Sequence, residues 1–460
     1  MELQDKRALV VGLGKSGLAA ALFLRGRGAR VTVSDTRSSA ALASEIPRLL
    51  EAGIMVEAGG HGLLTFRRQD LIVVSPGVPL DTPEVKQVMA FGLPVIGELE
   101  LASRYLQGRV VAITGSNGKT TTTSLLGKIF ADAGLPTQVG GNIGLPVIEL
   151  IANDTPETWN VLEVSSFQLE TVVDFHPQIA VILNLTPDHL DRHGNFENYA
   201  AAKEKIFARQ TAEDALVLNA DDRAVQMCAG KTRSRVFWFS ATKMVRQGTF
   251  VRDGVIAFVA KENGVTEPVM PVSEILLKGA HNTENVLAAA CVSRIAGISA
   301  ESIRTSVAAF RVVEHRLEFV AEVDGVAFYN DSKATNVDAT MKAIASFDRG
   351  VHLILGGKDK DSDYSLLAPL LRERVNAVYT IGSAAEKIER QLQGVVKMVK
   401  AGTIEVAVAQ AAMAAAAGDV VLLAPACSSF DQFESYEHRG RVFRELVWER
   451  SGTGVADAGE

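Results

Sequence analysis

Short apolar runs alternate with segments of helical length along almost the whole chain. Such runs occur at 8–11, 71–74, 110–113 and 179–185, and stretches long enough for helices separate them. Strands that alternate with helical segments are typical of parallel sheets covered by helices. The pattern therefore predicts an α/β protein.

The same pattern divides the chain into three blocks, 1–107, 108–312 and 313–460. Gln107-Gly108-Arg109 precedes a fresh apolar run and marks the first boundary, whereas the second boundary, near Val313, is softer. A length of 460 residues fits two to four domains. We predict one domain for each block. Strands of the third block are expected at 326–329, 351–355, 377–381 and 420–423.

A glycine-containing loop with a lysine follows the apolar run at 110–113. It reads Thr114-Gly115-Ser116-Asn117-Gly118-Lys119-Thr120-Thr121, and a helical stretch follows at 121–131. Glycines let backbone N–H groups turn towards phosphate oxygens, and a helix start adds partial positive charge. We expect Lys119 to reach the β- and γ-phosphates and Thr120 to ligate Mg²⁺. Ile113 stands where a full Walker A pattern has glycine, so this is a shortened variant; the alternative is a glycine-rich turn before a surface helix.

A second glycine-rich turn follows the first apolar run of the chain. Gly12, Gly14 and Gly17 have the spacing of a dinucleotide fingerprint, and Asp35 ends the next predicted strand. Taken alone, this turn favours NAD and an oxidoreductase. A helix N-terminus also binds other diphosphates, including that of a UDP-sugar, with Asp35 accepting from uracil or ribose.

Acidic and histidine side chains stand at the ends of two predicted strands of the second block. The run at 160–162 ends at Glu163, and the run at 179–185 gives way to a polar segment that contains Asp188 and His189. Ligand sites in open α/β sheets lie at such carboxyl ends. These residues are candidates for holding a metal, while capping and surface roles stay open as alternatives.

Lys203 lies on the apolar face of a predicted helix at 195–209. Tyr199 precedes it by four residues, and Ile206 and Phe207 follow it by three and four. A lysine there either extends its ammonium to the surface or meets a specific partner. Burial lowers the pKa of an amine, and a neutral amine can react with CO₂ to give a carbamate, which suits Mg²⁺.

Composition narrows the function classes. The net charge of −7 gives no support to nucleic-acid binding, and the three cysteines form no C-x-x-C pair, which fits a reducing compartment. No signal peptide and no apolar stretch long enough for a membrane span are found. We therefore expect a cytoplasmic protein without membrane insertion.

Together these residues resemble the Mur ligase family, and the resemblance covers nearly the whole chain. It is closest to the branch that adds D-glutamate, through GGNIG at 140–144, EVSSFQL at 163–169, DHLDR at 188–192, NDSKATN at 330–336 and PACSSFDQF at 425–433. The resemblance implies a Rossmann-like N-terminal UDP-binding domain, a P-loop-containing central ATPase domain and a Rossmann-like C-terminal domain that binds the amino acid.

The resemblance also implies where ATP and metal ions bind. Lys119, His189 and Lys203 would be catalytic. Two Mg²⁺ sites are implied, one at Thr120 and Glu163 and one at His189 and carbamylated Lys203. The residues implied for ATP are Gly115, Ser116, Asn117, Gly118, Lys119, Thr120, Thr121, Asn285, Arg316 and Asp331.

The other two substrates implied by the resemblance are UDP-N-acetylmuramoyl-L-alanine and D-glutamate. The reaction would be ATP-dependent amide-bond formation through an acyl phosphate, in peptidoglycan precursor synthesis, and a monomer is expected. The residues implied for the UDP-linked substrate are Ser16, Asp35, Thr36, Arg37, Gly77, Asn142 and Ser165. Those implied for D-glutamate are Thr335, Lys360, Ser429 and Phe430.

Three other functions compete with this interpretation. An NAD-dependent oxidoreductase would use the turn at Gly12, but the phosphate loop argues against it. A nucleotide-binding switch would use the phosphate loop without convergence of Glu163, His189 and Lys203. A sister ligase would add another amino acid, but the Asp-Asn-Pro-Arg motif of the diamino-acid-adding enzyme is absent from the sequence. The folate ligase lacks a UDP-binding domain such as the first block predicts.

Overall fold

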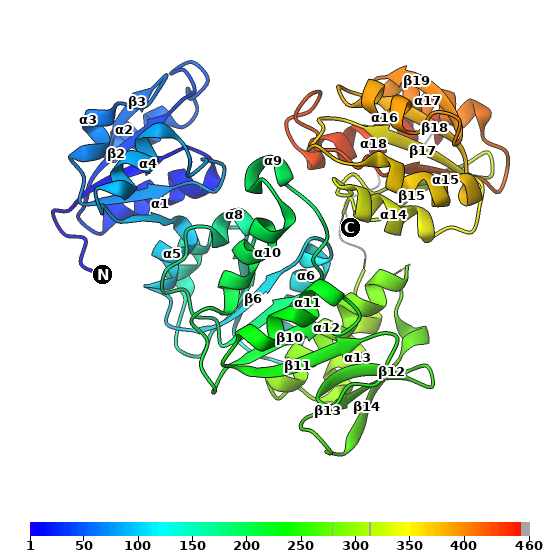
Figure 1. Cartoon of the computed structure of the whole chain (residues 1–460), viewed down its shortest axis with the longest axis horizontal. Coiled ribbons are helices and arrows are strands. Elements are labelled where there is room, and N and C mark those ends of the chain that lie inside the picture. The colour runs from blue at the N-terminus through cyan, green and yellow to red at the C-terminus, as the bar shows by residue number, and fades with distance from the viewer. Residues whose placement is uncertain (278, 312–313, 452–460) are drawn as a thin grey trace.

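A computed structural model describes residues 1–277, 279–311 and 314–451, and these contain three β-sheets, each accompanied by helices (Figure 1). We call the chain segments that contain these sheets the first unit (1–107), the central unit (108–311) and the third unit (314–451). The predicted α/β character with parallel sheets is confirmed. The boundary expected between 312 and 313 falls outside the described residues, as does the segment 452–460.

The first unit has a five-stranded sheet in which every neighbouring pair is parallel. Buried apolar side chains fill β1 and β4 almost throughout, as expected for strands covered on both faces. In sheet order the strands are β3 (Met55–Ala58), β2 (Arg30–Asp35), β1 (Arg7–Val11), β4 (Leu71–Val74) and β5 (Val95–Gly97). The helices are α1 (Lys15–Gly26), α2 (Ile46–Glu51), α3 (Leu63–Arg67), α4 (Pro83–Ala90) and α5 (Glu98–Ser103).

The central unit has a nine-stranded sheet, parallel except where β13 pairs with its two neighbours. In sheet order its strands are β14 (Thr266–Pro271), β13 (Val255–Val259), β12 (Gly248–Arg252), β11 (Arg235–Ser240), β10 (Ala215–Asn219), β9 (Ile179–Ile182), β6 (Arg109–Thr114), β8 (Trp159–Glu163) and β7 (Thr137–Gly141). Its helices are α6 (Lys119–Asp132), α7 (Val147–Leu150), α8 (Ser166–Leu169), α9 (Leu190–His193), α10 (Phe196–Glu204), α11 (Arg223–Gln226), α12 (Ala280–Ile295) and α13 (Ala300–Ala309), with 3₁₀ turns η1 (Ile151–Asn153), η2 (Lys205–Phe207), η3 (Met227–Lys231) and η4 (Val272–Glu274).

The third unit has a six-stranded sheet that is parallel except for its edge strand β15. In sheet order the strands are β15 (Glu318–Val323), β16 (Val326–Asn330), β20 (Val420–Leu423), β17 (Val351–Gly356), β18 (Val375–Ile381) and β19 (Lys397–Gly402). Its helices are α14 (Val337–Ala345), α15 (Ala368–Arg374), α16 (Ala385–Gln391), α17 (Ile404–Ala414) and α18 (Tyr436–Ser451), with the 3₁₀ turn η5 (Tyr364–Leu367).

The predicted strands agree with the structure to within a few residues, with one informative exception. The apolar run expected as a strand at 179–185 leaves the sheet after Ile182. Beyond that point Asn184 exchanges hydrogen bonds with the backbone of Asn117 instead of with a neighbouring strand. The expected helix at 195–209 is α10 followed by the 3₁₀ turn η2.

Buried carboxylates at α5 join the first unit to the central unit. Glu100 is fully buried and accepts hydrogen bonds from the backbone N–H groups of Val173, Asp174 and Phe175. Glu98 accepts from the N–H of Ile148. One apolar core runs from the first unit to one face of the central sheet, so these two units pack as a continuous body.

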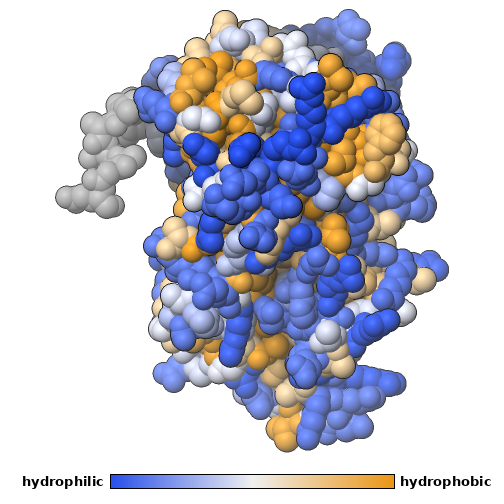
Figure 2. Space-filling model, turned by 90° about the vertical axis from the view of Figure 1, so that its left-hand side faces the viewer, coloured by the Kyte–Doolittle hydropathy of each residue, from blue (hydrophilic) through white to orange (hydrophobic). Residues whose placement is uncertain are grey.

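The outer surface mixes polar and apolar residues. Figure 2 shows apolar groups gathered in the upper part of one face, with polar residues around them. Among the described residues, no helix is both long and apolar enough to cross a membrane. Exposed large apolar side chains of the first unit include Leu50, Met55, Leu64, Met89 and Phe91.

Candidate active site

The phosphate-type loop lies at the carboxyl edge of the central sheet. Strand β6, which ends in this loop, pairs with β8 on one side and β9 on the other, so the residues that follow all three strands meet there. Gly118 has φ of 83° at the start of α6. A Cβ at Gly118 would lie 2.2 Å from Oδ1 of Asn285, so both the backbone angle and the space require glycine.

Lys119 is folded back over the loop. Its Nζ donates to the carbonyl oxygens of Gly115 and Ser116, both at 2.8 Å. Burial lowers the pKa of Lys119, although the charges of Glu163 and Asp188 oppose that shift. The two carbonyls are partners that an incoming phosphate can replace, because the ammonium sits on a flexible stem.

A carboxylate and a hydroxyl meet directly beside this loop. The Thr120 hydroxyl donates to Oε2 of Glu163 at 2.8 Å, and Nδ2 of Asn142 donates to Oε1 at 2.7 Å. Burial opposes ionisation of Glu163, but the positive charges of Lys333 and Lys119 outweigh it and lower the pKa. Glu163 is therefore a buried carboxylate at neutral pH.

Asp188 and His189 follow β9 and face the third unit. Oδ1 of Asp188 accepts from Lys360 at 3.4 Å, and Oδ2 accepts from Asn336 at 3.1 Å. Burial opposes ionisation of Asp188, but the charges of Lys360 and His189 lower its pKa to about 2. Burial lowers the pKa of His189 to about 3, against the attraction of Asp188, so its imidazole is neutral at physiological pH.

Lys203 is buried, so the alternative in which it extends to the surface is wrong. Its side chain is 1% exposed, and Nζ donates to the carbonyl of Gly115 at 2.8 Å and to Oγ1 of Thr114 at 3.3 Å. Burial places the pKa of Lys203 well below its usual value, and the charge of Lys119 adds to the effect. The last turn of α10 faces the phosphate-type loop and not water, which is why the lysine points inward.

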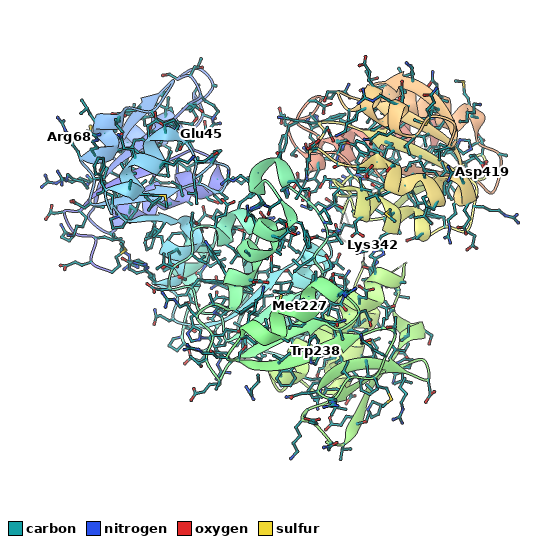
Figure 3. The ribbon with its side chains drawn as sticks, viewed as in Figure 1. Glu45, Arg68, Met227, Trp238, Lys342 and Asp419 are labelled. Atoms are coloured by element: carbon teal, nitrogen blue, oxygen red, sulfur yellow. The ribbon has the colours of Figure 1, made fainter. Side chains whose placement is uncertain are left out.

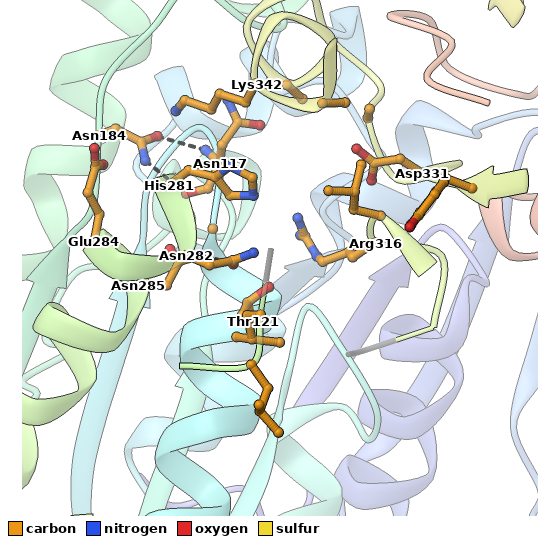
Figure 4. Close-up of a pocket in the computed structure, with 18 of the residues that line it drawn as sticks. Asn117, Thr121, Asn184, His281, Asn282, Glu284, Asn285, Arg316, Asp331 and Lys342 are labelled. Atoms are coloured by element: carbon orange, nitrogen blue, oxygen red, sulfur yellow. Dashed lines mark hydrogen bonds between the residues drawn. The ribbon is translucent and has the colours of Figure 1, made fainter. Parts of the chain in front are cut away.

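A pocket of about 170 Å³ lies between the phosphate-type loop and the third unit. Figure 4 shows Asn117 and Asn184 on one side of it and Arg316 and Asp331 on the other. Asn285, at the first turns of α12, also lines it. The predicted ATP residues Asn117, Gly118, Thr121, Asn285, Arg316 and Asp331 are thus brought together.

A larger cleft of about 690 Å³ lies between the first and central units, and Lys333, Tyr436 and Glu437 of the third unit also line it. It collects the predicted residues Ser16, Asp35, Thr36, Arg37, Gly77 and Asn142. Ser165 does not line this cleft; it caps α8, accepting from Gln168 N and donating to Gln168 Oε1. That capping requirement explains its place in the sequence without any ligand.

Asp35 organises the rim of this cleft. Its two carboxylate oxygens accept from the backbone N–H of Leu13 at 2.7 Å and from the guanidinium and N–H of Arg37. Burial opposes ionisation of Asp35, but these bonds from Arg37 and Leu13 lower its pKa. The carboxylate holds the glycine-rich turn and Arg37 in place.

The four residues expected to contact an amino acid do not all lie in one cleft. Lys360 reaches Asp188 across the gap to the central unit, and Ser429 is buried after β20. Phe430 is 68% exposed. Thr335 is half-buried, and its N–H donates to the carbonyl of Lys333. None of the four lines either of the two clefts.

The sequence pattern assigns no role to several residues that lie at the site. Lys333 lines the larger cleft together with Tyr436, and its Nζ lies 3.7 Å from the centroid of that ring. Lys342 and His281 line the smaller pocket. Lys333 lies within the NDSKATN segment, so the segment was a usable signal; nothing local marks Lys342 or His281.

The donor chemistry around Glu163 fits a hard divalent cation. A carboxylate beside a hydroxyl at a phosphate-type loop supplies oxygen ligands, which Mg²⁺ prefers. In the described part of the chain, no group of three or more His, Cys, Asp and Glu side chains is placed to hold a metal ion. Substrate phosphates and water normally complete the coordination of Mg²⁺.

Three stretches of the chain match domains of one protein family. Residues 6–97 match the MurD-like N-terminal domain of Mur ligases, residues 113–293 match the Mur ligase middle domain, and residues 315–427 match the Mur ligase glutamate ligase domain. The three matches follow one another along the chain in the order of the three sheets.

Curated relatives span nearly the whole chain. The UDP-N-acetylmuramoylalanine–D-glutamate ligase of Acidobacterium capsulatum is 68% identical over 98% of this chain and 98% of its own length. The ligase of the same name from Koribacter versatilis is 59% identical over 97% of this chain and 98% of its own length.

Solved structures share the fold at low sequence identity. The UDP-N-acetylmuramate-alanine ligase of Thermotoga maritima has a TM-score of 0.60 at 19% identity, covering 96% of this chain and 99% of its own. A pseudomurein peptide ligase type C from Methanothermus fervidus has a TM-score of 0.59 at 20% identity, covering 97% of this chain and 100% of its own.

Proposed function

The chain belongs to the Mur ligase family, and on this premise we propose that it joins D-glutamate to UDP-N-acetylmuramoyl-L-alanine with the hydrolysis of ATP. It is an ATP-dependent, amide-bond-forming ligase of peptidoglycan precursor synthesis. The observation that carries the proposal is the loop at 114–121, with Thr120 bonded to the buried carboxylate of Glu163 beside it. The oxidoreductase, switch and sister-ligase alternatives find no support in the relatives.

We assign one domain to each unit. Residues 1–107 form a Rossmann-like UDP-binding domain, residues 108–312 a P-loop ATPase domain, and residues 313–460 a Rossmann-like domain for the amino acid. The all-parallel first sheet with order β3-β2-β1-β4-β5 supports the first assignment, because such sheets bind ligands at the carboxyl ends of the strands. A monomer in the cytoplasm suits this plan, since one chain brings all three units to the site.

ATP is assigned to the phosphate-type loop and the smaller pocket. Backbone N–H groups at 115–121 and Lys119 would hold the phosphates. Asn285, Arg316 and Asp331 line the pocket and would hold the nucleoside. Because Arg316 and Asp331 come from the third unit, the nucleotide would contact two units at once.

The UDP-linked substrate is assigned to the larger cleft. Ser16, at the start of α1, and Gly77 face the cleft beside the glycine-rich turn, where the N–H groups of a helix start suit a diphosphate. Thr36 and Arg37 lie at the rim that Asp35 fixes. Asn142 lies where the cleft approaches Glu163, so the substrate's carboxylate would arrive beside the phosphate-type loop. Ser165 contributes indirectly, because it caps the helix that follows Glu163.

D-Glutamate is assigned to residues of the third unit near Asp188. Lys360 supplies a cation suited to a carboxylate, and Thr335 and Ser429 supply hydroxyls. Phe430, largely exposed, would cover the amino acid from the solvent side. The pairing of Lys360 with Asp188 must loosen when the amino acid binds.

The proposed reaction has two steps, phosphoryl transfer and then attack by the amine. A carboxylate oxygen of the L-alanyl group attacks the γ-phosphorus of ATP, which forms an acyl phosphate and releases ADP. The D-glutamate amine then attacks the acyl carbon, the C–O bond to phosphate breaks, and inorganic phosphate leaves as the amine loses a proton. Lys119 and loop N–H groups stabilise the charge on the transferring oxygens. The third unit shields the acyl phosphate from water.

Two metal positions are proposed. Thr120 and Glu163 would hold one Mg²⁺, which supplies charge neutralisation between the carboxylate and the triphosphate. His189 would ligate a second through its neutral imidazole, because a pKa of about 3 makes it a poor base but leaves its nitrogen lone pair free. Burial lowers the pKa of Lys203 and so favours its neutral amine, which would react with CO₂ to give the carbamate that completes this second site.

Phosphate release should depend on which enantiomer of glutamate is present. With UDP-N-acetylmuramoyl-L-alanine and ATP, D-glutamate should drive multiple turnovers, whereas L-glutamate should leave the rate close to the no-amine background. A coupled phosphate assay, with the product identified by mass spectrometry, checks this. Equal rates with both enantiomers, or release without any UDP-linked substrate, would contradict the proposal.

The affinity for ATP should depend on pH through Asp331. Burial raises the pKa of this carboxyl to about 7, against the opposing effect of Arg316 and the backbone N–H of Leu317. Below that pH it takes up a proton and loses its negative charge, so it becomes a weaker acceptor for ribose hydroxyls beside Arg316. We expect the KM for ATP to rise as the pH falls from about 8 to about 6, by up to about tenfold over the whole range. In Asp331→Asn this pH dependence should disappear; a KM that still rises with acidity there would exclude Asp331 as its cause.

A further inference from the structure

Two charged side chains of α14 have no role in the proposal above: Lys342 lines the nucleotide pocket, and Asp338 lies beside the lining residue Asn117. Oδ2 of Asp338 accepts from Nδ2 of Asn117 at 2.6 Å, and the same oxygen lies 3.0 Å from Nζ of Lys342. Asp338 and Lys342 belong to the third unit, whereas Asn117 belongs to the phosphate-type loop. Figure 3 shows Lys342 on the side of the third unit that faces the central unit.

Lys342 lies inside the pocket lining and not on an outer surface. Its side chain is 28% exposed, and Figure 4 shows it extending over the pocket towards Asn117 and Asn184. Its charge is felt across the pocket by two groups of α12: it contributes to lowering the pKa of His281, after burial, and opposes the burial that raises the pKa of Glu284. Lys342 and Arg316 are the two cations that the third unit contributes to the pocket lining.

A bound nucleotide would change the two contacts that Asp338 makes with Asn117 and Lys342. One carboxylate oxygen is shared by the amide of Asn117, which belongs to the loop assigned to the triphosphate, and by the ammonium of Lys342 on α14. A triphosphate offers an ammonium several charged oxygens, whereas the one oxygen of Asp338 is already shared with the amide of Asn117. A carboxylate so close to the loop would also repel the incoming anion unless a cation accompanies it. Lysine suits such a transfer, since its compact charge sits on a flexible stem.

We propose that Lys342 is an additional nucleotide-contacting residue. Asp338 positions its ammonium in the free protein, and when ATP binds the ammonium moves from Asp338 to the phosphate oxygens of the nucleotide. Asp338 acts as a positioning residue, because it fixes both the lysine and Asn117 of the loop. This inference rests on the proposed function, since it takes the loop to be an ATP site. The proposed contact gives a function to the part of α14 that lines the pocket, where Lys342 follows Asp338 by four residues.

Steady-state kinetics of Lys342→Met test the proposal. We expect the KM for ATP to rise about tenfold, because a hydrogen bond between two charged groups is lost. The KM values for D-glutamate and for the UDP-linked substrate should stay within about twofold of the parent. Lys342→Arg should recover most of the ATP affinity, since it keeps the charge. Lys397→Met, which removes an exposed lysine on β19 of the same unit, is the matched control and should change nothing.

Competition experiments identify the part of the nucleotide that Lys342 contacts. The inhibition constant of ADP against ATP should weaken about tenfold in Lys342→Met, while that of adenosine should not change. Equal weakening of both inhibitors, or of neither, would overturn the contact with the polyphosphate. If the unaltered protein does not bind ADP at all, the proposed function itself fails; if it binds ADP and the Met variant binds equally well, only this inference fails.

Discussion

Lys119→Ala is expected to reduce ATP-dependent ligation by on the order of 10³-fold. Lys119 supplies the side-chain cation of the loop at 114–121, and its two present partners are carbonyl oxygens of the same loop. In the transition state, negative charge is spread over the oxygens of the transferring phosphoryl group, and a fixed cation in a water-poor site stabilises that charge strongly. The loss should therefore fall mainly on kcat.

Phosphate release with all three substrates measures this effect. Lys128→Ala is the matched control, because Lys128 lies on the same helix, α6, and pairs with Asp132 away from the loop. That control should keep the parental rate. Circular dichroism should show the same folded state for both variants, since the hydrogen bonds of the Lys119 ammonium to Gly115 and Ser116 stay within the loop. Ligation by Lys119→Ala at near-parental rates would mean that the loop does not hold the reacting phosphate.

Lys203→Ala should also lose activity by on the order of 10³-fold, for a different reason. The amine is fully enclosed, and its pKa is lowered well below the usual value, first by burial and then by the charge of Lys119. These are the conditions in which lysine is neutral and reacts with CO₂. Removing the side chain would remove the carbamate oxygens proposed to hold the second Mg²⁺ with His189.

Chemical rescue separates this role from a merely structural one. A short carboxylic acid added to Lys203→Ala should restore part of the activity, because its carboxylate can occupy the vacated space as an oxygen ligand. Lys205→Ala, at the neighbouring 3₁₀ turn, should remain active, since its ammonium bonds the carbonyl of Glu170 outside the site. Mass spectrometry of the native protein should show the added mass of CO₂ on Lys203. An unmodified Lys203 in a fully active protein would contradict the carbamate.

The parts of the site that lie within one short stretch of sequence could be predicted well. The phosphate-type loop joins β6 to α6 without interruption, so the order of strand, glycines, lysine and helix specifies its geometry locally. Glu163 could be placed for the same reason, because it ends a buried strand next to β6. The carboxyl ends of parallel strands lie at one edge of the sheet. These positions could therefore be predicted from the pattern alone.

The depth of Lys203 could not be predicted in the same way. Its helical face was clear from Tyr199, Ile206 and Phe207, but whether a long side chain turns inward depends on what packs over that face. In the structure the phosphate-type loop lies there and offers a carbonyl. Ser165 shows a second limit of the pattern: its capping of α8 is seen in the structure, whereas its expected contact with the UDP-linked substrate stays a prediction.

Contacts between the central and third units were beyond reach from sequence. Asn117 and Asp338 are 221 positions apart, and Asp188 and Lys360 are 172 apart. No local periodicity relates such residues, since the relative placement of two units is set by their whole surfaces. The roles of Lys342 and Asp338 therefore emerge only when α14 is seen against the loop.

In the proposed reaction, the terminal phosphoryl group of ATP passes to the carboxylate of the UDP-linked substrate. Labelling both carboxylate oxygens of the L-alanyl group with ¹⁸O tests this most directly, because the oxygen that attacks phosphorus leaves with it. The inorganic phosphate released with D-glutamate should carry one labelled oxygen, and the amide product should keep the other. Unlabelled phosphate from a reaction that still forms the amide would contradict it.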